Sequence, residues 1–167
     1  MAPPPKTPAA ETAALIERAE GHERARRYDL ARAAYSEAVE KAPDPRSGAH
    51  AAHRFGSALA FWGELEAGVS MLERAVSLDS KRASAWHDLG IVRANSGDLV
   101  AGEVALRKAR ELAAKDPRPR VALAALLVKT RRFTEAQSEY RALLELELPE
   151  KTRSAILRAL ELLASEG

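Results

Sequence analysis

The stretch AWHDLGIVRANSGDLVAGEVALRKA, residues 85–109, recurs in degenerate form on both sides of itself at a fixed step. Three columns of similar residues repeat every 34 positions: Gly68, Gly102 and Ala136; Gly56, Gly90 and Ala124; Leu72, Leu106 and Tyr140. Independent columns with one shared period are typical of stacked supersecondary units. The period therefore predicts a repeat protein, in which function belongs to the surface that the repeats build together.

The composition favours helices. Of the 167 residues, 46% are hydrophobic and 30% charged, and the dominant alanine and leucine have high helix propensity. The net charge of +2 mixes both signs at helical spacings, so it does not require a nucleic-acid partner. The absence of cysteine excludes disulfides and thiolate sites. No apolar run is long enough for a membrane span, and the first residues lack a secretory signal, so we expect a cytoplasmic protein.

Apolar residues recur at intervals of three and four, and glycine and proline interrupt them. This pattern predicts an all-α chain with helices near residues 10–25, 28–41, 47–62, 65–78, 82–96, 99–114, 117–130, 133–147 and 150–164. The helices pair into hairpin repeats at 12–45, 49–82, 83–116 and 117–150. We expect residues 1–10 to be a disordered tail rich in proline and alanine, and residues 151–167 to be a helix that caps the last repeat.

Small residues are predicted where the two helices of a hairpin cross. Glycine inside a helix costs about 1 kcal/mol relative to alanine, so its repeated use indicates a close backbone approach. In the third repeat Gly90 is expected to meet Gly102, and a leucine at position 90 should destabilise the protein by overpacking. Gly63 and Gly97 lie between helices, where a left-handed C-cap is favoured, and Asp98 is a candidate N-cap.

These columns resemble the tetratricopeptide repeat, a family with a 34-residue period and a pattern of Trp, Leu-Gly, Tyr, Ala, Phe and Pro. In 83–116 the matching residues are Trp86, Leu89-Gly90, Gly97-Asp98, Gly102, Leu106 and Ala109, and comparable residues occur in the other three repeats. The resemblance implies an α-solenoid of about four hairpins in a right-handed superhelix. It also implies that the first helix of each hairpin lines a concave groove, which receives a peptide or an amphipathic helix of a partner.

Carried over position by position, the resemblance places one face of each first helix in this groove. The expected partner-binding residues are His50, His53, Ser57, Phe61, Ser84, His87, Ile91, Asn95, Arg118, Val121, Val128 and Lys129, to which the first repeat adds Ile16, Glu20 and Arg24. Trp62, at a position that is often polar in the family, is expected to be an aromatic anchor at the rim of the groove. The apolar middle and basic edges of this set suit an apolar peptide or helix with some acidic groups. The alternative for Phe61 and Ile91 is packing between neighbouring helices. The alternative for Trp62 is that its ring covers the helix turn before Gly63.

Two further residue groups have alternative interpretations. The histidines His50, His53 and His87 could hold a metal ion or make the groove sensitive to pH, but no carboxylate is clearly placed to support them, and we interpret them as polar surface residues. The basic residues of the fourth repeat are followed at once by glutamates and indicate a solvated helix face: Arg118, Arg120, Lys129, Arg131 and Arg132. No catalytic motif occurs, and no cofactor or metal is expected.

The sequence therefore predicts a non-enzymatic adaptor or assembly scaffold that binds another protein. Two alternatives stay open. One is a secretion-type chaperone that holds an apolar segment of a client. The other is a homo-oligomeric structural element, in which Trp62 or the last helix packs on a second copy.

Overall fold

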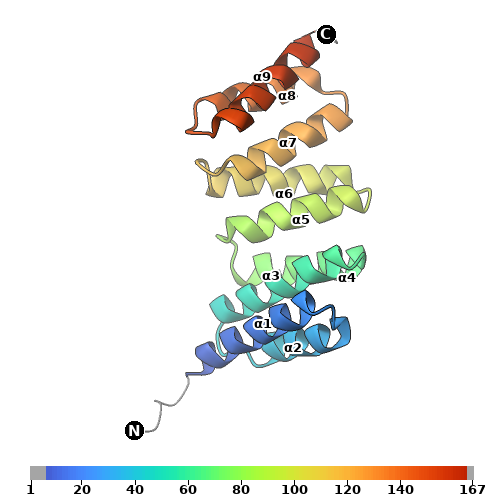
Figure 1. Cartoon of the computed structure of the whole chain (residues 1–167), viewed down its shortest axis with the longest axis vertical. Coiled ribbons are helices and arrows are strands. Elements are labelled where there is room, and N and C mark those ends of the chain that lie inside the picture. Colours follow the sequence, from blue (N-terminus) through green and yellow to red (C-terminus); the bar gives the residue numbers. More distant parts are fainter. Residues whose placement is uncertain (1–6, 165–167) are drawn as a thin grey trace. The chain divides into compact units, whose positions relative to one another are not determined.

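The structure, a computed structural model, describes residues 7–164 of the chain. Over this range it contains nine α-helices and no β-strand (Figure 1). The helices are α1 (Pro8–Arg24), α2 (Tyr28–Glu40), α3 (Pro45–Phe61), α4 (Leu65–Leu78), α5 (Ala83–Asn95), α6 (Leu99–Leu112), α7 (Pro117–Lys129), α8 (Phe133–Leu144) and α9 (Glu150–Ala164). Consecutive helices pair into hairpins, as predicted, so that α1 packs along α2, α3 along α4 and α7 along α8.

All the predicted helices are present, and every end agrees with its predicted position within three residues. The difference at the start of the chain has a local cause. The Thr7 hydroxyl accepts a hydrogen bond from the Ala10 backbone N–H at 3.3 Å, and Pro8 occupies the first helical position, where its missing N–H costs least. Residues 8–10 are therefore helical and do not belong to the predicted tail, whose residues 1–6 lie outside the described range.

Aspartate side chains fix the starts of three further helices. Asp44 and Asp116 each accept a backbone N–H bond at 2.9 Å, directly before the prolines that begin α3 and α7. Asp98, the predicted N-cap, accepts the N–H of Ala101 at 3.0 Å. Because each cap contributes about 1 kcal/mol, the beginnings of these helices are set by residues next to them in sequence.

The turn inside each hairpin has one backbone geometry. Gly63 and Gly97, predicted as left-handed caps, have φ angles of +90° and +98°. Arg26 and Arg131 occupy the equivalent positions of the first and fourth hairpins, with φ angles of +57° and +60°. In all four turns the N–H of the next residue donates to the carbonyl five residues earlier, over 2.8–2.9 Å. This is the Schellman motif, and a left-handed arginine costs about 1 kcal/mol where a glycine would not.

The predicted close approach of the hairpin helices is confirmed at the glycine pairs. A Cβ atom on Gly90 would lie 2.6 Å from the Leu106 Cγ and 2.9 Å from the Gly102 carbonyl oxygen. The second hairpin is almost as tight, because a Cβ on Gly56 would lie 3.0 Å from the Gly68 carbonyl oxygen. These helices touch backbone to backbone, so the crossings have no room for a side chain.

The helices group into two compact units, which divide between Ala85 and Trp86 and which we call the N-terminal and C-terminal units. In the N-terminal unit the fully buried Tyr35 stacks on Phe55 with 5.7 Å between ring centroids, and its hydroxyl donates to Glu23 at 3.0 Å. The core of the C-terminal unit contains Leu106, Leu123, Leu126, Leu127, Ala136 and Leu163. Each unit thus has its own apolar centre.

The last helix, α9, packs against α8. Its Leu163 joins the core of the C-terminal unit, and the Leu163 carbonyl accepts a hydrogen bond from Gln137 Nε2 at 3.1 Å. Leu157 and Leu162 of the same helix are 45% and 70% exposed. Within residues 7–164, none of the helices combines the length and the apolar character that crossing a bilayer requires.

Candidate functional site

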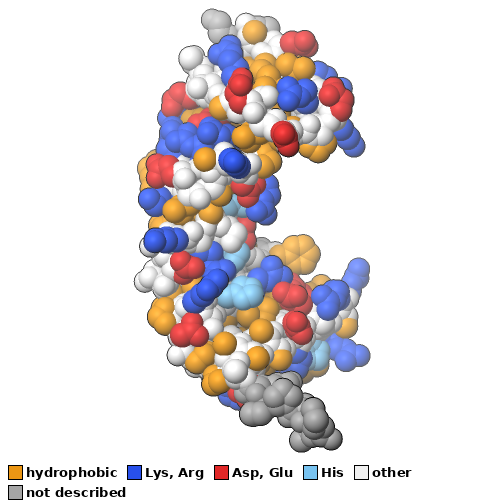
Figure 2. All heavy atoms as spheres, turned by 90° about the vertical axis from the view of Figure 1, so that its left-hand side faces the viewer, with side chains coloured by type: hydrophobic (Ala, Val, Ile, Leu, Met, Phe, Trp, Pro, Cys, Tyr) orange, Lys and Arg blue, Asp and Glu red, His pale blue; other side chains and the backbone are white. Residues whose placement is uncertain are grey.

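The predicted partner-binding residues divide between the two units. Those of the N-terminal unit lie on α3, directly after it, or in the first turn of α5: His50, His53, Ser57, Phe61, Trp62 and Ser84. Those of the C-terminal unit lie on α5 and α7: His87, Ile91, Asn95, Arg118, Val121, Val128 and Lys129. On the face drawn in Figure 2, acidic and basic side chains are interspersed with apolar ones. Each unit therefore has its own candidate surface.

A groove lies between α5 and α7 in the C-terminal unit. Its volume is about 290 Å³, and it is lined by Ile91, Ala94, Asn95, Leu106, Ala122, Ala125, Leu126 and Lys129. Leu106 and Leu126 are buried, whereas Ile91 is 36% exposed. The structure thus brings together Ile91, Asn95 and Lys129, three of the residues that the sequence predicted for the groove.

Small side chains keep this groove open and leave its polar groups accessible. Alanine at positions 94, 122 and 125 removes bulk from the facing sides of the two helices. Within residues 7–164, the side chains of Asn95 and Lys129 have neither a hydrogen bond nor an ion pair to the rest of the protein. The asparagine amide can both donate and accept, and the lysine ammonium can donate to a carboxylate. The groove therefore combines an apolar base with two polar groups at its edge.

Other predicted residues of the C-terminal unit do not line the groove. Val128 packs against the core, and Val121 is 41% exposed. Arg118 donates to Asp116 at 2.7 Å, and this bond lowers the pKa of the Asp116 carboxyl below its usual range. His87 lies half-buried on α5.

Phe61 dominates the candidate surface of the N-terminal unit. Its ring is 79% exposed at the last residue of α3. It lies between two hollows. The smaller, of about 280 Å³, is lined by Glu20, Glu23, Arg24, Arg54 and Phe61, and the larger, of about 540 Å³, by Tyr28, Asp29, Arg32, Phe61, Trp62 and Glu64. The structure therefore brings Glu20 and Arg24 of the first repeat together with Phe61 around the smaller hollow.

The Trp62 ring packs against α2. Its ring meets Tyr28 edge-on at 5.7 Å between centroids and Tyr35 at 6.5 Å, and the Arg32 guanidinium lies 5.5 Å from its centroid. All three partners belong to α2. The packing favours the structural interpretation of Trp62, although the ring also lines the larger hollow beside Phe61.

The histidines of α3 differ in their surroundings. His53 is only 8% exposed, and its carbonyl accepts a hydrogen bond from the Ser57 hydroxyl at 3.0 Å. His50 is at the surface, but partial burial of its ring, followed by the positive charge of Arg82, lowers its pKa below 6.5. His50 therefore gains a proton only under more acidic conditions than an ordinary histidine. In the described part of the chain, no three histidine, aspartate or glutamate side chains are grouped so as to hold a metal ion.

Comparisons with known proteins identify the architecture. A family model of the tetratricopeptide repeat matches residues 49–82, the second hairpin. The chain has the tetratricopeptide repeat fold. A search of curated protein sequences finds no significant match.

Three solved structures illustrate the similarity. The crystal structure of YrrB, described as a TPR protein with an unusual peptide-binding site, has 19% sequence identity and a TM-score of 0.72 over 91% of this chain and 75% of that one. PilF of Pseudomonas aeruginosa has 19% identity and a TM-score of 0.74 over 98% and 72%. The Yersinia enterocolitica type III secretion chaperone SycD, in complex with a peptide of the translocator YopD, has 17% identity and a TM-score of 0.64 over 69% and 91%.

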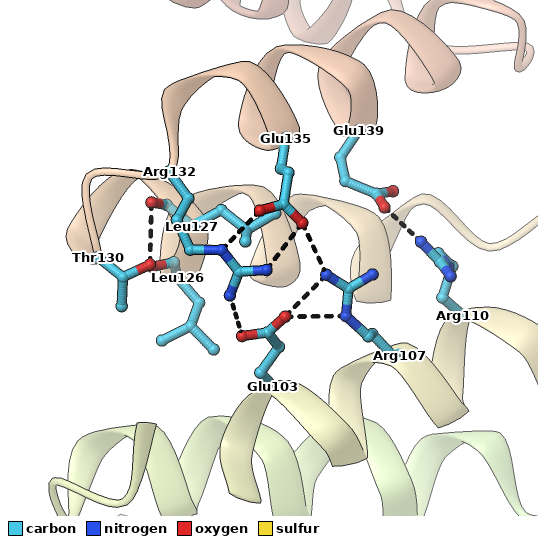
Figure 3. Close-up of polar contacts among 9 residues, drawn as sticks. All are labelled: Glu103, Arg107, Arg110, Leu126, Leu127, Thr130, Arg132, Glu135 and Glu139. Atoms are coloured by element: carbon cyan, nitrogen blue, oxygen red, sulfur yellow. Dashed lines mark hydrogen bonds and ion pairs between the residues drawn. The ribbon is translucent and has the colours of Figure 1, made fainter. Parts of the chain in front are cut away.

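Arg132, one of the basic residues of the fourth hairpin, belongs to an ion-pair network that joins α6 to the start of α8 (Figure 3). Arg132 donates to Glu135 at 2.6 Å and to Glu103 at 2.5 Å, and Arg107 bonds to the same two carboxylates. The bonds from Arg132 lower the pKa of Glu135. Burial raises the pKa of Glu103, but the bonds from Arg132 and Arg107 outweigh it and lower the pKa.

A second part of the network centres on Glu139, which is 7% exposed on α8. Arg110 of α6 bonds to one oxygen of this carboxylate (Figure 3). Arg120 of α7 donates to the other oxygen at 2.8 Å. These interhelical pairs were missed from the sequence, where the arginines and glutamates indicated only a solvated face. The sequence feature that could have revealed them is the 29-residue separation of Arg110 and Glu139. With a 34-residue repeat, this separation places the two residues on the second helices of neighbouring hairpins.

Proposed function

We propose that this protein is an adaptor that binds a peptide or short helix of another protein in the groove between α5 and α7. The observation that carries the proposal is the combination of an apolar base at Leu106 and Leu126 with the unengaged Asn95 and Lys129 at the edge. An apolar side chain of the partner enters the space beside Ala94 and Ala125, while Lys129 pairs with a neighbouring carboxylate. The helices form the groove in advance, which lowers the entropic cost of binding.

Two of the similar structures support this proposal, because their descriptions name peptide binding. YrrB is described as having a peptide-binding site, and SycD was solved with a translocator peptide. In this proposal the protein is a non-enzymatic, cytoplasmic scaffold whose partner is a protein segment and not a nucleic acid. No cofactor takes part.

The second candidate is a secretion-type chaperone, which the similarity to SycD favours. The two functions predict different behaviour of the partner. A chaperone client aggregates when it is expressed alone and stays soluble only with this protein. The partner of an adaptor is soluble by itself.

The proposal is tested by capture of partners from an extract of the source organism, followed by titration with the purified partner. The double variant Ile91→Glu, Ala125→Glu places carboxylates in the groove and should abolish capture. Val100→Glu is the matched control, because Val100 is 77% exposed on α6 and does not line the groove. Circular dichroism should show equal helicity for all three proteins. Undiminished capture by the double variant would exclude the groove as the binding site.

A further inference from the structure

Three arginines are unpaired at the end of α1 and in the turn that follows it. Arg24, Arg26 and Arg27 are exposed, and within residues 7–164 none of them forms an ion pair or a side-chain hydrogen bond. Arginine elsewhere in the N-terminal unit is often paired, as Arg54 is with Glu20 at 2.8 Å. Unpaired guanidinium groups this close in sequence repel one another, so their presence needs a compensating reason.

In the equivalent turn of the fourth hairpin, the two corresponding arginines form contacts within the protein. Arg132 corresponds to Arg27 and is bound by the two carboxylates of the network described above. Arg131 corresponds to Arg26, and its guanidinium lies 5.9 Å from the Phe133 ring centroid. In the first hairpin both arginines lack such contacts.

The backbone of Arg26 is strained. It has a φ angle of +57° where the second and third hairpins place Gly63 and Gly97. A glycine at position 26 would relieve this strain. The cost of arginine is therefore offset only if its side chain makes a favourable interaction. Strained residues of this kind occur often at binding sites.

An exposed aromatic surface adjoins Arg24, and Arg26 and Arg27 directly precede its Tyr28 in the chain. Arg24 lines the smaller hollow together with Phe61, and Tyr28, which is 45% exposed, lines the larger one. Trp62 fixes the base of this surface through its contacts with Tyr28 and Arg32. The 79% exposed ring of Phe61 is therefore presented from a packed helix end, and binding to it requires little ordering.

We propose that the surface formed by Arg24, Arg26, Arg27, Tyr28 and Phe61, here named the Arg–Phe surface, binds acidic protein segments that carry an aromatic or large aliphatic side chain. The apolar side chain packs against Phe61 in the adjoining hollows, and carboxylates of the segment accept paired N–H bonds from the guanidinium groups.

Charge complementarity selects this occupant. Among the described residues that line the two hollows, the carboxylates without an ion pair are Glu23, which already accepts the Tyr35 hydroxyl, and Asp29. The three arginines outnumber them. The Arg–Phe surface belongs to the N-terminal unit and is a second site, beyond the groove proposed above.

The test uses the full chain and a labelled synthetic peptide in which one phenylalanine is flanked on both sides by glutamates, with binding followed by fluorescence anisotropy. Phe61→Ser and the double variant Arg24→Glu, Arg27→Glu should each weaken binding by roughly tenfold or more. The matched control is Arg74→Glu. Arg74 on α4 is also exposed and unpaired, but it lines neither of the two hollows beside Phe61. The control variant should bind as wild type does. Added salt should weaken wild-type binding.

Glycine substitutions separate recognition from stability. Arg26→Gly should raise the melting temperature, because it relieves the left-handed strain, yet weaken peptide binding several-fold. Arg131→Gly relieves the same strain in the fourth hairpin and should leave peptide binding unchanged. Equal binding by wild type and Arg26→Gly would remove this arginine from the site.

The outcomes divide clearly. Wild type that does not bind the peptide up to its solubility limit, or variants that all bind alike, would overturn the proposal, as would tighter binding of a single-stranded oligouridine than of the peptide. The Ile91→Glu, Ala125→Glu variant should bind this peptide normally, so failure of the α5–α7 groove and failure of the Arg–Phe surface can be told apart.

Discussion

Replacing Gly90 by alanine should destabilise the protein, although alanine is the better helix former. Helix propensity alone favours alanine by about 1 kcal/mol. The added Cβ, however, would lie 2.6 Å from the Leu106 Cγ and 2.9 Å from the Gly102 carbonyl oxygen. Neither neighbour can yield alone, because one belongs to the core and the other to the backbone of α6. Overpacking of this kind costs about 1–3 kcal/mol, and backbone contact points to the upper end. The net loss is then about 2 kcal/mol.

Urea unfolding followed by circular dichroism measures this loss, and thermal unfolding should show a melting temperature lower by about 6 °C. Gly21→Ala is the matched control. A Cβ on Gly21, inside α1, would meet only Arg24 Nη2, at 3.9 Å. That variant should gain up to about 1 kcal/mol from propensity. A Gly90→Ala protein as stable as wild type, with Gly21→Ala behaving as expected, would show that the hairpin helices do not cross as closely as described.

Three further substitutions test other parts of the structure. Glu139→Ala should lower the free energy of unfolding by about 2–3 kcal/mol, because it leaves Arg110 and Arg120 half-buried without their carboxylate; a loss below half of this value in urea unfolding would mean that water replaces the pair. Glu103→Gln should lower the melting temperature at neutral pH. The pKa of Glu103 is depressed below 4.5 in the folded state, so its contribution is complete above pH 4.5 and is lost as the pH falls through the depressed value. Melting scans should therefore show the gap from wild type narrowing as the pH falls below 4.5 through the lowered pKa of Glu103, and a constant gap would contradict the ion-pair account. Trp62→Ala should cost about 2 kcal/mol in urea unfolding, less than for a fully buried ring, whereas no loss would assign Trp62 to recognition rather than packing.

The fold could be predicted from the sequence because its determinants repeat or lie close together along the chain. The 34-residue columns place Gly56, Gly90 and Gly102 at the crossings, where the structure has them. Helix starts depend on Asp98 and on prolines, whose effects are local. Ile91, Asn95 and Lys129 meet in one groove because three- and four-residue spacing fixes which side of a helix they occupy.

Other features depend on contacts that the pattern does not specify. Arg26 and Arg131 adopt the left-handed conformation only because the hairpin turn demands it; arginine has no preference for it. Helical spacing assigned Phe61 and His53 to one predicted groove, but one is 79% exposed and the other 8%, since exposure depends on what packs alongside. The carboxylates that neutralise Arg132 come from two helices, and only the register between hairpins brings them within reach.

The common geometry of the four turns has a consequence for how such a chain grows. Each of the four hairpin turns contains a left-handed residue, followed by a residue whose N–H donates to the carbonyl five positions earlier. Because the turn lies inside the hairpin, a gene duplication that copies one whole hairpin also copies its turn. Duplication of a hairpin can therefore lengthen the protein without a new turn sequence. The other side chains of each copy can then change, provided that the residues of the turn keep this geometry.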